Sequence, residues 1–389
     1  MSSQLDPQTK QDLLNPKERS FTQRLATAAD WRTAILIPLL SVITALLIGI
    51  VIIVLTGSSF GDAMAAYGAL LEGSVGSLRA VSETLTAATP LMLAGLSVAL
   101  AFRAGLFNIG GEGQALIGGM FAVWVGFSIT GIPIFIHLPL AILAGIVGGA
   151  IWGFIPGILK AKTGAHEVIT TIMLNYIALR LVDFLLKTTM FQREGRNDPL
   201  SKNIESSAEY PAFLGGIDSA LRVHAGLFVA LAAAFLIYWL LFRTTIGFEF
   251  RAVGANPSAA RYAGISVTKV YVMVMLIAGA LAGTAGAGQV LGVLGRTTPG
   301  FTADLGFDGI AVALLGRSNP WGVVAAAILF GGLRAGGQQM QVSASVGIDL
   351  ISVIQALIII LVAAPALIAS IYRLKTPVAS TQISKGWGS

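Results

Sequence analysis

The chain has 389 residues, of which 55% are hydrophobic and 11% are charged, and its mean hydropathy is +0.80. A soluble domain carries about 25% charged residues, so this composition excludes a soluble protein and predicts an all-α integral membrane protein. The net charge of +6 does not indicate nucleic-acid binding, because the basic residues are distributed by membrane side. The absence of cysteine excludes disulfides and thiolate sites, and the three histidines lack the spacing of metal ligands.

Ten runs are predicted to be membrane segments, on the rule that a helical span needs about 20 apolar residues, although the second and eighth are short or interrupted. The runs are continuous and rich in Ala and Leu, which favours helices over the short alternating strands of a β-barrel. The first is too long for a signal peptide and has no cleavage site, so it is predicted to be a retained span. The predicted segments are roughly 34–55, 85–101, 114–130, 138–158, 168–186, 224–242, 270–291, 304–316, 320–337 and 347–371.

The distribution of Lys and Arg predicts the orientation. Sixteen of these residues lie on the side that would hold both termini and seven on the other side, which places both termini in the cytoplasm. The chain then divides into a cytoplasmic tail (1–32), a transmembrane domain (33–371) and a second cytoplasmic tail (372–389). The longest outer loop, 187–223, is interpreted either as a solvated connector or as a docking rim for an extracellular partner. The longest cytoplasmic loop is 243–269.

The stretch Ala101–Val123 carries an Arg, an Asn, a Glu, a Gln and six glycines between two apolar runs. Irregular backbone at membrane depth is tolerated only where protein or a water-filled cavity surrounds it. We therefore expect Asn108 to Gln114 to dip into the bundle from the cytoplasmic side and to line the path of a polar solute. Residues predicted to line this path are Asn108, Glu112, Gln114 and Asn175.

Two of these residues have an alternative interpretation. Glu112 could instead form a structural ion pair with Arg103. Asn175 lies near the middle of an apolar segment, where a hydrogen bond to a neighbouring helix is as good an explanation as contact with a solute.

Glycine recurs at every fourth position of the fourth segment, which places these glycines on one helix face and predicts close backbone packing. The predicted packing face comprises Gly145, Gly149, Gly153 and Gly157. The same device recurs at Gly279 and Gly283 and at Gly332 and Gly336. Segments two to five and seven to ten also run in opposite directions through the membrane, the pattern of an inverted repeat.

Within the loop 243–269, Asn256 and Pro257 predict the start of a short helix, because Asn caps helices and Pro fits their first position. This basic helix could lie on anionic headgroups or fit a groove on a cytoplasmic partner. No phosphate-binding loop, zinc-protease motif or nucleophile elbow occurs, so no catalytic residue is predicted and the chain is not expected to be an enzyme. No cofactor or metal site is predicted in this chain.

Four stretches together carry a family resemblance. They are FNIGGEGQALIGG (107–119), HEVITTIMLNYIA (166–178), RAVGANPSAARYAGI (251–265) and GFDGIAVALLGRSNPWG (306–322). From about residue 85 to 370 the chain resembles the permease subunit of bacterial ATP-binding-cassette (ABC) importers for nucleosides and simple sugars, and its nucleoside branch most. One departure is His166, where many relatives carry Asn, so we assign position 166 no substrate role.

The resemblance implies a type II importer fold in the bacterial cytoplasmic membrane, assembled from two permeases and two ATPase units. Implied partners are a cytoplasmic ATPase chain with two nucleotide-binding halves that holds the ATP, a second and shorter permease, and an extracytoplasmic nucleoside-binding lipoprotein. The segment from Arg251 to Gly264 would be the coupling helix in the ATPase groove. Its implied coupling residues are Arg251, Gly254, Asn256, Pro257, Ala260 and Gly264.

The leading hypothesis is therefore ATP-driven nucleoside uptake. One alternative keeps the machinery and changes the cargo to a simple sugar such as ribose or galactose. Another is a secondary transporter driven by an ion gradient, which the inverted repeat favours and the scarcity of intramembrane acids disfavours.

Overall fold

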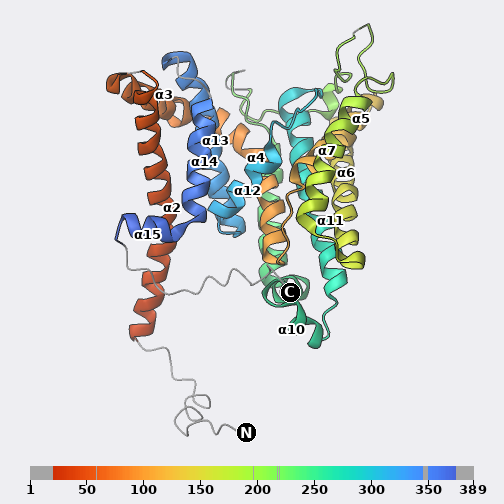
Figure 1. Cartoon of the computed structure of the whole chain (residues 1–389). Helices are drawn as coiled ribbons and strands as arrows, with labels where there is room; N and C mark the ends of the chain where they lie inside the picture. The colour runs from red at the N-terminus through yellow and green to blue at the C-terminus, as the bar shows by residue number, and fades with distance from the viewer. Residues whose placement is uncertain are drawn as a thin grey trace.

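The structure is a computed structural model that describes residues 21–57, 59–195, 197–216, 218, 220–344 and 349–373. Within these residues all regular structure is helical, apart from two isolated antiparallel bridges in the outer loop. The helices stand side by side as a bundle (Figure 1). The helices are α2 (Phe21–Leu55), α3 (Phe60–Val75), α4 (Leu78–Arg103), α5 (Gly111–Ser128), α6 (Ile134–Thr163), α7 (Glu167–Leu185), η1 (Ser206–Ala208), α8 (Gly226–Arg243), α9 (Thr245–Ala255), α10 (Pro257–Tyr262), α11 (Val267–Gln289), the π-helical turn η2 (Val290–Leu294), α12 (Leu305–Leu315), α13 (Pro320–Ala344), α14 (Asp349–Ala363) and α15 (Pro365–Ile371).

Six stretches of the described helices are long and apolar enough to cross a membrane. They are Leu36–Leu55, Leu78–Arg103, Ile134–Thr163, Glu167–Leu185, Gly226–Arg243 and Val267–Leu294. Shorter apolar helices fall at Leu305–Leu315 and Leu350–Val362. The chain is thus a multi-pass helical membrane protein, whereas the number of crossings, about ten, stays a prediction.

Each predicted segment overlaps a helix, but the structure adds and divides elements. Helix α3 falls where no segment was predicted, and it starts with a capping box in which Ser59 and Asp62 bond each other's backbone amides. The tenth predicted segment, 347–371, is wrong as a single helix, because it breaks at Ala364 between α14 and α15. Pro365 explains the break, since proline has no amide hydrogen with which to continue the helical hydrogen bonds. Helix α2 begins at Phe21, inside the predicted tail 1–32, and residues 1–20 and 374–389 of the predicted tails lie outside the described part.

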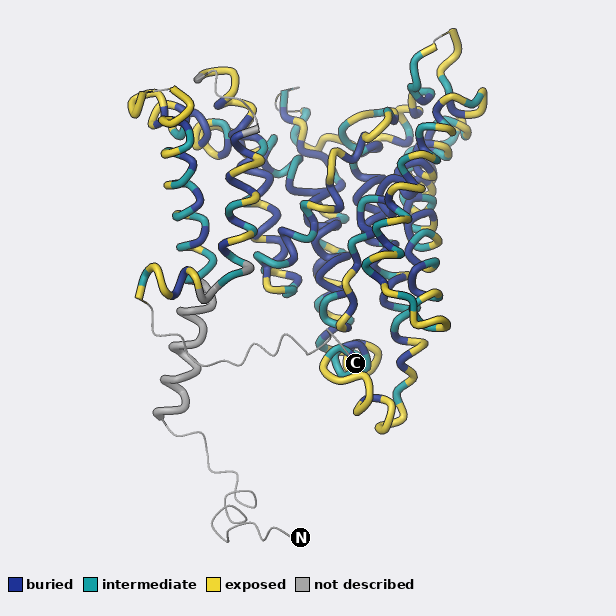
Figure 2. The backbone as a smooth tube through the Cα atoms, viewed as in Figure 1, coloured by how far each residue is buried: buried dark blue, intermediate teal, exposed yellow. Residues whose placement is uncertain are grey.

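Helix α4 is the most buried of the candidate spans, and α11 packs beside it and against α5 and α6. One hydrophobic cluster joins α2, α3, α4, α12, α13 and α14 with α8, α9 and part of α11. A second joins α5, α6 and α7 with the outer loop and the end of α11. Buried backbone is concentrated in the middle of the bundle (Figure 2).

Part of the outer loop 187–223 packs on the bundle, while many of its other residues are exposed, so both interpretations of the loop stay predictions. Ile204, Ala208 and Tyr210 are each at most 7% exposed, so this part of the loop covers the end of the second cluster. His137 in α6 is fully buried and anchors the loop to the bundle. Its Nδ1 lies 2.8 Å from the Ser207 hydroxyl of the loop, and its Nε2 lies 3.1 Å from the Val125 carbonyl oxygen of α5. Helices α9 and α10 lie at the opposite end of the bundle (Figure 1).

Candidate functional site

Helices α5 and α12 begin beside one another inside the bundle. A Cβ atom at Gly306 would lie 2.0 Å from the Glu112 backbone nitrogen, and one at Gly111 would lie 3.4 Å from the Gly306 Cα. Gly309, the fifth residue of α12, packs on Ala94, which lies nine residues before the end of α4 and so about 14 Å up that helix. Two helix N-termini therefore meet at depth, and glycine is what allows their backbones to touch.

Glu112 joins the two N-termini. Its carboxylate accepts the amide hydrogen of Gly306 at 2.7 Å and the hydroxyl hydrogen of Thr302. A carboxylate at this position satisfies an otherwise orphan donor of the first turn of α12 and suits the positive end of that helix. Arg103, the alternative partner, instead donates to the Ser318 carbonyl at 2.8 Å, so the Arg103–Glu112 ion pair is not formed.

Asn108 and Gln114 bond to each other. Each is 1% exposed. The Asn108 amide donates to the Gln114 Oε1 at 3.0 Å, and the Gln114 amide donates back at 3.1 Å. The Asn108 oxygen also accepts the Gly110 amide hydrogen at 3.0 Å, which shapes the turn into α5. In this conformation the pair fixes the start of α5, and its contact with a solute stays a prediction.

Asn175 attaches α7 to the same turn. Its Oδ1 accepts the amide hydrogen of Gly113 at 2.9 Å, and its Nδ2 donates to the Ile109 carbonyl at 2.9 Å. Asn175 thus caps α5 as Glu112 caps α12, in both cases from a different helix. The helix–helix hydrogen bond proposed for Asn175 is present, and a solute contact is not tested by it.

An ion pair between Asp308 of α12 and Arg334 of α13 was missed by the sequence analysis. Both residues lie in apolar segments, and their side chains are 20% and 32% exposed. An ionisable residue in such a segment needs a partner. The sequence did carry a signal for this ion pair, because one acid and one base lie on successive apolar helices. Thr302 was also missed, because nothing in the sequence links it to Glu112 across 190 positions.

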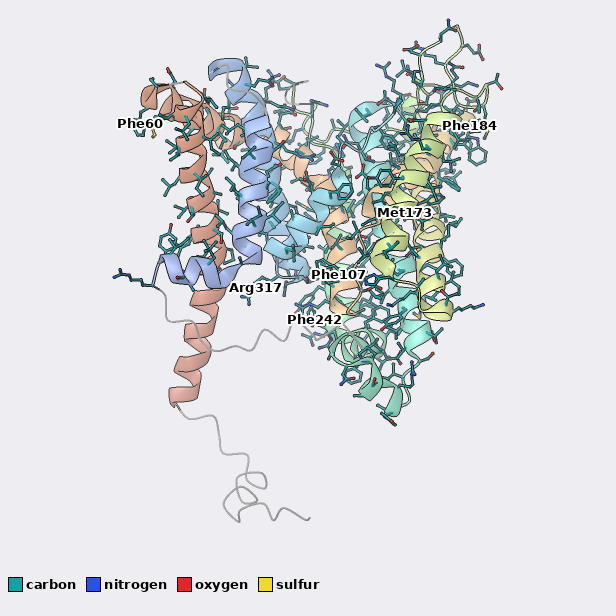
Figure 3. The ribbon with its side chains drawn as sticks, in the orientation of Figure 1. Phe60, Phe107, Met173, Phe184, Phe242 and Arg317 are labelled. Atoms are coloured by element: carbon teal, nitrogen blue, oxygen red, sulfur yellow. The ribbon has the colours of Figure 1, made fainter. Side chains whose placement is uncertain are left out.

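The loop 243–269 is held against α4. A Cβ atom at Gly254 would lie 2.3 Å from the Arg103 carbonyl oxygen, so α9 touches the end of α4 directly. The guanidinium carbons of Arg103 and Arg251 lie 5.7 Å and 5.4 Å from the centre of the Phe242 ring. These distances allow cation–π attraction to hold both cations at the end of α8. Phe242, Phe107 and Arg317 lie toward the same end of the bundle as α10 (Figure 3).

Helix α10 follows α9 and extends beyond these contacts with α4 and α8. The Asn256 side chain accepts the amide hydrogen three residues on at 3.0 Å, Pro257 takes the first helical position, and Gly264 ends the turn with φ +83°. Ala260 is 5% exposed and faces inward, whereas Tyr262 is 95% exposed. The helix therefore presents one rigid exposed face, as a lever in a groove would require.

Glycines of α6 lie against α11 without side chains between the helices. A Cβ atom at Gly149 would lie 2.2 Å from the Gly279 carbonyl oxygen, and one at Gly153 would lie 2.4 Å from the Met275 carbonyl oxygen. A Cβ atom at Gly145 would lie 2.6 Å from the Ala287 Cβ, and one at Gly157 would lie 2.9 Å from the Met275 Cβ. Among the described residues no three His, Asp or Glu side chains come together as a metal site would need.

Comparison with known proteins finds one family model, described as "Branched-chain amino acid transport system / permease component", that matches residues 80–363. A guanosine ABC transporter permease protein of Bacillus subtilis, NupP, is 44% identical over 330 residues, which cover 85% of this chain and 93% of that protein. A nucleoside ABC transporter permease protein of Lactococcus lactis, NupB, is 37% identical over 334 residues, 85% and 90% of the two chains.

A glucose ABC transporter permease protein of Haloferax volcanii, TsgB13, is 39% identical over 329 residues, 83% of this chain and 85% of that one. The Lactococcus lactis nucleoside permease protein NupC also matches, at 29% identity over 261 residues, 64% of this chain and 79% of that one. No solved structure matches the chain.

Proposed function

The chain belongs to the branched-chain amino acid transport system / permease component family, and we propose that it is the permease subunit of an ABC importer that carries nucleosides across a bacterial cytoplasmic membrane. The observation that carries this proposal is the similarity to NupP and NupB, which extends over 85% of the chain. Glucose is the cargo named for TsgB13, so a simple sugar is the second candidate. An ion-gradient transporter loses its support, because the inverted repeat that favoured it is equally expected of an ABC permease.

We infer that α4–α7 and α11–α14 are the two halves of an inverted repeat. The contacts come in corresponding pairs: α4 packs on α13 as α11 packs on α6, and α4 packs on α12 as α11 packs on α5. Close approaches also correspond. A Cβ atom at Gly331 of α13 would lie 2.5 Å from a carbonyl oxygen of α4, like that at Gly149 of α6 against α11.

The proposed path for the solute runs past the N-termini of α5 and α12. Short helices that begin inside a bundle leave polar backbone at depth, and transporters use such ends to bind and pass polar substrates. Asp304 and Phe307 are exposed there and Glu112 and Asp308 are partly exposed, so polar and aromatic groups face the space beside α12. Asn108, Gln114 and Asn175 would act as the second layer that fixes the helix ends.

ATP would be hydrolysed on a separate cytoplasmic chain, with α10 as the coupling helix. Lactococcus lactis has two matching nucleoside permeases, NupB and NupC, and this chain is more similar to NupB. We therefore propose a second, NupC-like permease as the other half of the path. Two further proposals complete the system: an extracytoplasmic nucleoside-binding lipoprotein that delivers the cargo, and cytoplasmic termini, on the side of α10.

The test is uptake of radiolabelled guanosine by cells that lack this chain and are complemented with variants. The unmodified chain should restore uptake. Asn256→Asp combined with Pro257→Gly should not, because it weakens the start of α10 and places a charge in the ATPase groove. Ser266→Ala is the matched control, since Ser266 caps α11 at the same end. Unchanged guanosine uptake without the chain refutes the function, and competition by glucose instead of nucleosides assigns the second candidate.

A further inference from the structure

A cavity of about 480 Å³ opens at the end of the bundle opposite α10. It lies between the outer loop, the start of α8 and the π-helical turn η2. Its floor is buried and its rim is charged. The cavity is lined by Ile134, Ser206, Glu209, Tyr210, Pro211, Ala212, Leu221, Arg222, His224 and Gly292. Its volume lies in the range of small-molecule sites, roughly 300–1,000 Å³.

His224 in the floor carries a hydrogen-bond donor without a partner. The residue is 2% exposed, and its Nδ1 accepts the Gly226 amide hydrogen at 3.2 Å. A neutral imidazole that accepts at Nδ1 holds its proton at Nε2, and no acceptor contacts that Nε2. Unpaired buried polar groups are rare in proteins and call for an explanation such as a ligand.

Gly292 keeps the ring edge of His224 uncovered by a side chain. A Cβ atom at Gly292 would lie 2.5 Å from the His224 Nε2 and 2.4 Å from its Cε1. Tyr210 stacks on the same ring, with 5.3 Å between ring centres and 23° between planes. The Nε2 atom thus has almost no accessible surface and lies beneath the Gly292 backbone, which lines the cavity.

The rim carries one positive and two negative side chains. Arg222 contributes a guanidinium, Glu209 a carboxylate, and Glu83 lies 3.5 Å from Arg222. Burial, with a smaller contribution from Arg222, lowers the pKa of His224 to about 4, so its ring is uncharged at neutral pH. A wall with donors and acceptors but no excess of positive charge favours a neutral, hydroxyl-bearing molecule over an anion.

We propose that this cavity, with Arg222 and Glu209 as its polar contacts and His224 in its floor, binds one neutral hydroxyl-bearing solute on the outer side of the permease. The proposal rests on the proposed function for the class of solute, which is then a nucleoside. The solute's hydroxyls would donate to Glu209 and accept from Arg222. An acceptor on the solute would reach the buried His224 Nε2–H only if the backbone at Gly292 moved aside. The site would hold the solute at the outer face, apart from the helix ends where α5 meets α12.

The test is equilibrium binding of radiolabelled guanosine to the purified transporter, complete with its partner permease and ATPase but without an extracytoplasmic binding protein. Arg222→Gln and Glu209→Gln should each weaken binding at least tenfold. Gly292→Ala should do the same, because its methyl group would cover the His224 ring edge. Gly288→Ala is the matched control on α11, since a Cβ atom there meets nothing within 4 Å. Size-exclusion profiles should show that all four variants fold.

Three outcomes would overturn the cavity site. They are the absence of saturable guanosine binding to the unmodified transporter, equal affinity of folded rim variants, and variants that lose only capture of the binding protein. The last would make the cavity a docking socket. Failure of the proposed function is distinct, because it appears as guanosine uptake that does not depend on this chain at all.

Discussion

Removing the Glu112 carboxylate should destabilise the junction between α5 and α12 by an amount that the structure sets. Glu112→Ala leaves the Gly306 amide and the Thr302 hydroxyl without their acceptor, and Thr302 is 2% exposed. Two hydrogen bonds to the carboxylate are lost in a partly buried site, so the expected cost is about 2–4 kcal/mol. Glu112→Gln should cost about 1 kcal/mol, because its oxygen can still accept from Gly306 while its amide donates to the Thr302 oxygen.

The assay is thermal unfolding of the detergent-purified chain, with a double-mutant cycle between Glu112→Ala and Thr302→Val. The two changes should be strongly non-additive, since the second removes a group that the first has already unpaired. Asp304→Asn is the matched control: it neutralises an exposed carboxylate at the same helix end and should leave stability unchanged. Additive effects, or a Glu112→Ala chain as stable as the unmodified one, would refute the capping argument.

Three further predictions use the same unfolding assay. Gly149→Ala should lower the free energy of unfolding by about 3 kcal/mol, because the added methyl group meets a backbone carbonyl. Gly68→Ala adds a methyl group that meets nothing and should leave this free energy unchanged. Equal effects of the two changes would contradict the packing argument. Asp308→Asn should lower the free energy of unfolding by about 1–3 kcal/mol by leaving Arg334 unpaired, less than for a fully buried pair because both side chains are partly exposed. Adding Arg334→Gln should recover much of this loss, and a double variant less stable than the single one would contradict the ion pair. His224 has a pKa of about 4 in the folded chain, below its value in the unfolded chain, so the unfolded chain binds more protons between these two values. Lowering the pH from 7 to 4.5 should therefore lower the free energy of unfolding by about 2 kcal/mol. A His224→Gln chain with the same pH dependence would contradict this.

Composition and the lengths of the apolar runs predicted the helical membrane class and most helix positions, because a bilayer demands long apolar helices and permits few charges. Helix α3 was not predicted, because Asp62, Glu72 and its glycines lower its apolar content below that of a membrane span. The break in the tenth segment carried a visible signal in Pro365. Its effect was masked by the apolar residues on both sides, which continue the hydropathy of one span.

The partners within the site could not be predicted, because they come from distant parts of the chain. Glu112 was singled out for its charge in an apolar context, but Gly306 and Thr302 lie about 190 positions away. Arg103 was the nearest base in sequence and so the obvious partner. The structure separates them, because after Arg103 the chain turns back into the bundle before α5 begins.

The position of α12 indicates how motion at one end of the molecule would reach its centre. This short helix is tied to α5 by Glu112, to α13 by the Asp308–Arg334 pair, and to α4 by the close approach of Gly309 to Ala94. Those ties span both hydrophobic clusters. At its other end α4 touches α9, where Gly254 meets the Arg103 carbonyl.

A displacement of α9 and α10 by the ATPase would therefore act on α4 first and on α12 next. Because α12 cannot follow both clusters at once, moving one against the other must break either the Glu112 cap or the Asp308–Arg334 pair. We expect the cap to yield first, since it consists of two hydrogen bonds without a counter-charge, whereas the ion pair unites opposite charges. Crosslinking α5 to α12 should then block transport, while a crosslink between α12 and α13 should spare it. The reverse result would place the moving boundary between α12 and α13.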